Sequence, residues 1–102
     1  MISATVAGAG LEILVPSPVT VNKPFLTDTT SASIYYYPNG PVNGKDYNAS
    51  YGWGHGTMTV TSVDTVNHKI AGTFSGTLHN FLDINDSVVL INGKFNTAYT
   101  IQ

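Results

Sequence analysis

Apolar and polar residues alternate with a period of two along much of the chain. In residues 69–78, Ile70, Phe74 and Leu78 fall on one face, while threonine, serine and lysine fall on the other. This alternation predicts a half-buried strand with a hydroxyl-rich outer face. Two glycines share the apolar face, and they indicate the close approach of a large neighbour such as Trp53 or a tyrosine.

The same pattern predicts a strand at residues 57–63, immediately before the first. The link between them, residues 64–68, consists of turn-forming residues, so we expect an antiparallel hairpin.

Residues 87–91 and 94–101 are also predicted strands, and Asn92-Gly93 lies between them. Asn-Gly is a strong signal for a two-residue hairpin turn, and we expect a second hairpin here. The alternative is a glycine bulge within one long strand.

Shorter strands are predicted in the N-terminal half. They fall at residues 3–7, 11–15, 19–21, 31–37 and 47–51. The first two flank Gly8-Ala9-Gly10 and are expected to pair as a hairpin, whereas the proline- and glycine-rich residues 38–44 predict a long turn. Roughly seven to nine short strands with regular turn signals indicate a sandwich or a small barrel. We expect one domain, residues 1–102, folded as an antiparallel β-sandwich of immunoglobulin-like or related type.

The low charge content restricts the classes of partner that such a domain can bind. Only 10% of the 102 residues are charged, against about 25% in an ordinary domain. The basic residues are four scattered lysines, with no arginine. Nucleic acid and anionic membrane surfaces are excluded as partners, because both require clustered basic residues. No transmembrane segment is expected, since the apolar runs are far shorter than the ~20 residues a span needs.

Low charge combined with many threonines, serines, asparagines and glycines is typical of secreted and cell-surface β domains. The chain has no cysteine, so no disulfide forms. No export signal is present in the sequence shown, and an extracellular or outer-surface location therefore requires a signal upstream of it.

Two stretches of the C-terminal half resemble a family of Bacteroidota surface lipoproteins of unknown function. Residues 56–78 carry its strand, its Asp-x-x-Asn turn and a strand reading Ile70-Ala71-Gly72-Thr73-Phe74, and residues 89–95 are similar to its closing strand. The resemblance covers about half the chain and implies a surface location and a β-domain fold, without an activity. The family's lipid-bearing cysteine and tryptophan-containing first strand have no counterpart here. We therefore expect a sandwich that lacks its first strand.

The aromatic residues are the leading candidates for a binding site. Exposed tryptophan and tyrosine rings stack on sugars, and we predict a ligand-binding surface formed by Trp53, Tyr35, Tyr37 and Tyr51. The alternative is that Trp53 lies in the core and the tyrosines cover a sheet face or an interface.

Three aspartates precede a serine or threonine in a pattern that resembles the O-glycosylation acceptor of Bacteroidota. The predicted modification sites are Thr29, Thr65 and Ser87. Asp-Thr is also ordinary turn chemistry, which is the alternative.

No metal site, cofactor or catalytic centre is predicted. His55, His68 and His79 lack the spacing that places ligands on one face, and the few carboxylates form no acid–base pair. The chain is not expected to be an enzyme.

From these observations we expect a non-catalytic structural domain of an extracellular or cell surface. We expect it to bind copies of itself by strand addition, as in a filament. A sandwich lacking one strand exposes unpaired backbone groups, and residues Ile2 to Val15 are the expected donor segment. The alternative is a carbohydrate- or small-ligand-binding module.

Overall fold

The computed structural model describes residues 2–6, 10–16, 19–38 and 46–101, and this part of the chain contains strands and no helix. The strands are β1 (Ile2–Val6), β2 (Leu11–Val15), β3 (Pro24–Leu26), β4 (Ser33–Tyr36), β5 (Tyr47–Ala49), β6 (His55–Asp64), β7 (Lys69–Asn80) and β8 (Asp83–Ile101). Their pairings are antiparallel. The predicted all-β, sandwich-like fold is confirmed.

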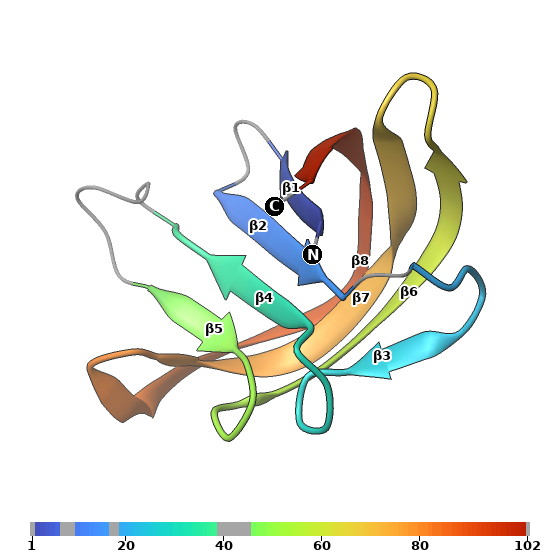
Figure 1. The fold of residues 1–102 in the computed structure, drawn as a ribbon. Helices are drawn as coiled ribbons and strands as arrows, with labels where there is room; N and C mark the ends of the chain where they lie inside the picture. The colour runs from blue at the N-terminus through green and yellow to red at the C-terminus, as the bar shows by residue number, and fades with distance from the viewer. Residues whose placement is uncertain (1, 7–9, 17–18, 39–45, 102) are drawn as a thin grey trace.

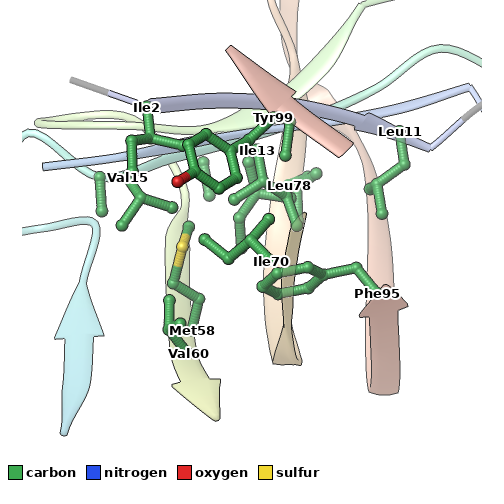
Figure 2. Packing of buried hydrophobic residues seen from close by; sticks show 14 of the residues in the cluster. Ile2, Leu11, Ile13, Val15, Met58, Val60, Ile70, Leu78, Phe95 and Tyr99 are labelled. Carbon is green, nitrogen blue, oxygen red and sulfur yellow. The ribbon is translucent and has the colours of Figure 1, made fainter. Parts of the chain in front are cut away.

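The eight described strands form one sheet of order β3-β6-β7-β5-β4-β2-β1-β8, in which β7 also pairs with β8, and this sheet folds into two layers that join at two corners (Figure 1). One layer has the order β5-β4-β2-β1 and the other the order β3-β6-β7-β8. At one corner Tyr47 and Asn48 of β5 pair with the end of β7, and at the other β1 pairs with residues 99–101 of β8. Strands of one layer run across those of the other, as in orthogonally packed sheets (Figure 2).

The core lies between the two layers and follows from the alternating pattern. In β2, every second residue is buried, and Ile13 is fully enclosed. Ile34 of β4, which pairs with Ile13, belongs to the same buried cluster. Met58 and Leu78 reach Ile13 from the other layer (Figure 2). Each deeply buried aliphatic side chain contributes about 1.5–3 kcal/mol of transfer free energy.

Gly72 has the large neighbour that the sequence predicted, but the neighbour is Phe95 and not Trp53. A Cβ atom at position 72 would lie 2.7 Å from the Phe95 ring and would collide with the backbone oxygen of Thr59. The glycine therefore lets a buried aromatic ring of β8 lie flat on β7.

The predicted hairpin at Asn92-Gly93 is wrong. Residues 83–101 form one long strand, β8, with a bulge in which Ile91 and Asn92 both lie opposite Ser75. Asn92 has a φ of 53°, which the bulge accommodates as readily as a turn would. Because β7 offers a partner along nearly the whole of β8, the strand continues instead of reversing.

Two further strand predictions need correction. Residues 19–21 form no strand, and the unpredicted β3 pairs with β6 instead. Pro24 begins β3, a position where a missing N–H removes no essential ladder bond. The predicted hairpins 57–63/69–78 and 3–7/11–15 are confirmed, whereas most of the predicted long turn, residues 39–44, and Gly8-Ala9 lie outside the described residues.

Candidate functional site

An open hollow of about 480 Å³ lies at one end of the molecule. It is bordered by the β3–β4 loop, the β5–β6 loop and the start of β8 (Figure 1). Its wall includes Asp28, Tyr51, Trp53, His55, His79 and Ile84. Aromatic, aliphatic and polar side chains thus converge on one concave surface, the composition typical of ligand sites.

A tight turn carries Tyr51 to the rim of this hollow. Ser50 and Trp53 exchange two backbone hydrogen bonds, of 2.8 and 2.9 Å, and close the turn between them. Gly52 has a φ of 76°, which suits the third position of such a turn. The Tyr51 side chain is 76% exposed as a result.

Trp53 lies deeper and is held in one orientation. Its Nε1–H donates a hydrogen bond of 3.2 Å to the backbone oxygen of His79, and the two rings meet edge to face, with centroids 6.1 Å apart. The following residue, Gly54, has a φ of 65°, and a Cβ there would lie 2.7 Å from the Thr77 oxygen. The loop therefore packs directly against β7, and the indole is fixed by it.

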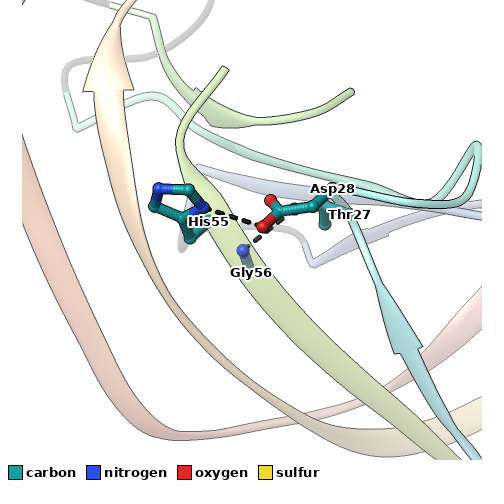
Figure 3. Close-up of polar contacts among 4 residues, drawn as sticks. All are labelled: Thr27, Asp28, His55 and Gly56. Carbon is teal, nitrogen blue, oxygen red and sulfur yellow. Dashed lines mark hydrogen bonds and ion pairs between the residues drawn. The ribbon is translucent and has the colours of Figure 1, made fainter. Parts of the chain in front are cut away.

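His55 and Asp28 form the polar side of the hollow (Figure 3). The His55 Nδ1 atom lies 2.8 Å from Asp28 Oδ2, and both side chains are exposed. The neighbouring residues anchor this pair, because the Gly56 N–H donates to Thr27 Oγ1 at 2.9 Å and the Thr27 N–H donates to the Gly56 oxygen.

His79 has an unusual environment on the inner side of the hollow. Its Nδ1 atom is buried and has no hydrogen-bond partner among the described residues. A buried polar atom without a partner is uncommon and calls for a physical explanation.

The four aromatic residues predicted as one binding surface divide between two places. Trp53 and Tyr51 line the hollow. Tyr35 and Tyr37 instead stack on each other beside Glu12, with ring centroids 6.4 Å apart and planes 3° from parallel. Burial, followed by the negative charges of Asp46 and Glu12, raises the pKa of Tyr37. Asp28 and Ile84 were not predicted, since both are remote from the aromatic motif in sequence, and His55, two residues after Trp53, was considered only as a metal ligand.

The predicted glycosylation sites Thr29, Thr65 and Ser87 are all exposed. Asp64, before Thr65, accepts hydrogen bonds from the backbone N–H groups of Val66 and Asn67. Turn chemistry thus accounts for this aspartate, and modification at the three sites remains a prediction.

Within the described residues, no three histidine or carboxylate side chains lie close enough to hold a metal ion. In the same part of the chain, no helix is long and apolar enough to cross a membrane.

The second layer has a long open edge. Residues 87–96 of β8, which we call the free edge, pair with β7 on one side and with no described strand on the other. Val89 and Ile91 are 65% and 70% exposed on the outer face. Such an edge presents unpaired backbone N–H and C=O groups to a further strand.

The predicted donor segment, Ile2 to Val15, pairs within its own chain. It forms β1 and β2, and Ala4, Ile13 and Val15 are buried in the core. Donating it to another molecule would require opening this core, so the free edge of β8 is the accessible place for strand addition.

Comparison of the chain with protein-family models, with curated proteins and with solved structures gave no match.

Proposed function

We propose that this protein is a non-catalytic structural domain of an extracellular or cell surface that associates with a second copy of itself along β8. The observation that carries the proposal is the free edge with its exposed Val89 and Ile91. A long, weakly charged edge with apolar residues is a template for pairing with another chain.

Two copies pair most simply in antiparallel fashion about a two-fold axis, because the same patch then serves both partners. An axis at Asp86 would place two aspartates opposite each other, which is unfavourable. An axis at Asn92 would fall on the bulge, where the ladder is interrupted. The favoured axis therefore lies between residues 87 and 90, and the two β3-β6-β7-β8 layers join into one continuous sheet.

This geometry favours a closed pair over the filament expected from the sequence. A filament needs two complementary edges on each subunit. The other edge of the layer is β3, which has three residues and begins with Pro24, and short edges containing proline resist pairing.

The composition supports the proposed setting. Only 10% of the residues are charged and the formal net charge is −2, so repulsion between copies is weak. The resemblance to Bacteroidota surface lipoproteins agrees with an outer-surface location. A glycan on Ser87, which lies on the free edge, would block association.

Sedimentation velocity over a concentration series tests the proposal. The wild-type chain should shift from monomer to dimer as its concentration rises, and Val89→Lys should raise the dimer Kd about tenfold, the equivalent of about 1.4 kcal/mol. Val66→Lys is the matched control, because Val66 is 87% exposed in the β6–β7 turn. A wild-type chain that stays monomeric, or equal effects of the two lysines, would overturn the proposal.

A further inference from the structure

We propose that the hollow at Tyr51 and Trp53 binds a neutral pyranose sugar, with Tyr51 as the stacking platform and the Asp28–His55 pair as the hydrogen-bonding wall. This proposal is independent of the self-association described above.

The ring of Tyr51 has the properties of a stacking platform. It is 76% exposed at the tip of a tight turn and has no ring contact among the described residues. A pyranose has an apolar face of C–H groups and a polar rim of hydroxyls. Its apolar face suits the tyrosine ring, and its polar rim requires donors and acceptors close by.

The Asp28–His55 pair, which lines the same hollow, supplies those groups. In the His55–Asp28 pair, Nδ1 and Oδ2 are occupied by each other. Among the described residues, Asp28 Oδ1 and His55 Nε2 have no such partner. A carboxylate oxygen accepts from one hydroxyl, and the imidazole nitrogen donates to or accepts from its neighbour. Each of the two atoms can therefore pair with a hydroxyl of a sugar ring.

The charge of the hollow selects against acidic sugars. Among the described residues that line it, Asp28 carries the one carboxylate, and no lysine is present. Uronic and sialic acids would place a second negative charge against this carboxylate, which is unfavourable. A neutral hexose meets no such repulsion, and the volume of about 480 Å³ is ample for one ring.

The site is also largely preformed. The Ser50–Trp53 hydrogen bonds, the Trp53 contact with His79 and the Thr27–Gly56 bonds fix the walls. Binding then requires little ordering of the protein, which lowers its entropic cost.

Tryptophan fluorescence tests the proposal, because Trp53 is the only tryptophan of the chain. The probes are the methyl pyranosides of glucose, galactose, mannose and N-acetylglucosamine, with glucuronic acid as the charged comparison. At least one neutral probe should change the Trp53 emission saturably, and glucuronic acid should bind at least fivefold more weakly than the matched neutral sugar.

Variants distinguish stacking from a nonspecific effect. Tyr51→Ala should weaken binding at least fivefold, and Asp28→Asn should reduce the discrimination against glucuronic acid. Tyr35→Ala is the matched control, since it removes a tyrosine from the separate Tyr35–Tyr37 stack and should leave Kd unchanged. Tyr51 is exposed, so its loss leaves the fold intact, which far-UV circular dichroism verifies. No saturable change with any neutral probe, or equal losses in the two tyrosine variants, would overturn the proposal.

Discussion

The two edges of the β3-β6-β7-β8 layer differ in length and in proline content, two properties that govern strand pairing. β3 is three residues long, begins with Pro24 and is tied to β6 on its inner side. The free edge of β8 spans residues 87–96 and displays Val89 and Ile91. The layer can therefore pair with another strand along β8 but not along β3.

The physical cause of this difference lies in how each edge is fixed. The residues around β3 are tied down by discrete contacts, including Asn22 N–H to the Val60 oxygen and the bonds between Thr27 and Gly56. β8 is held by its long ladder with β7, so its other side needs no further contact for the strand to persist. The open edge is therefore compatible with a stable monomer.

The largest expected effect on stability comes from truncating a buried side chain of β7, the strand that lies between the two edges. Leu78 lies fully buried on β7, in the middle of the layer. Leu78→Ala should lower the free energy of unfolding by about 2–5 kcal/mol, because it leaves a cavity. Urea unfolding measures this loss of free energy. The control is Val66→Ala at an exposed position, whose free energy of unfolding should stay within about 0.5 kcal/mol of the wild-type value. A loss below about 1 kcal/mol for Leu78 would contradict the packing of the layer on this strand.

Loosening β3 should open the second edge. Thr27 is fully buried and accepts the Gly56 N–H. Thr27→Val keeps the shape but leaves this N–H without its partner, which should cost about 1–3 kcal/mol. Hydrogen exchange of the Gly56 amide should accelerate, and sedimentation should reveal species larger than the dimer. Exposed Thr20→Val serves as the control, and unchanged Gly56 exchange would refute the anchoring role.

The bulge in β8 depends on a residue with left-handed backbone geometry. Asn92 has a φ of 53°, and a β-branched residue in this left-handed region is strained by about 1–2 kcal/mol. Asn92→Val should destabilise the protein by that amount in urea, whereas Asn92→Gly should retain or slightly raise its stability. Equal stabilities of the two variants would argue against a left-handed residue at this position.

The smallest effect concerns the β6–β7 turn, which belongs to neither edge. Hydrogen bonds from the Asn67 side chain, and then from backbone N–H groups of Asn67 and Val66, lower the pKa of Asp64 below its ordinary 3.8. The stability that Asp64 contributes is complete above pH 3.8 and is lost as the pH falls through the lowered value. The difference in urea midpoint between wild type and Asp64→Ala should therefore shrink in acid, while the dimer Kd is unchanged at neutral pH. A difference that is constant with pH would contradict this assignment.

Local pattern was sufficient to predict two of the three hairpins, whereas the continuous strand β8 depends on a long-range pairing that the local pattern does not indicate. The pairing of residues 57–63 with 69–78 follows from alternation and a short turn. Asn92-Gly93 suits a bulge as well as a turn, and only the length of β7 decides between them. Pro24 reads as a strand breaker, yet at the start of an edge strand it is tolerated.

The candidate site shows the same division. Tyr51 and Trp53 are separated by one residue in sequence and were both predicted. Their polar neighbour Asp28 lies 27 residues before His55, and nothing local indicates that the two meet. Sequence placed Tyr35 and Tyr37 with them because all are aromatic, whereas in the structure Tyr35 and Tyr37 stack on each other beside Glu12 and do not line the hollow.

Distances between spin labels test the pairing of two free edges most directly. The chain has no cysteine, so Thr77→Cys on β7 and Leu26→Cys on β3 each introduce a single labelling site. With strands about 4.8 Å apart, paired β8 edges place the two Thr77 labels within about 20 Å and the two Leu26 labels beyond about 30 Å. Electron paramagnetic resonance at dimer-forming concentration should give these two ranges. A shorter distance for Leu26 than for Thr77, or no coupling at either position, would contradict association through β8.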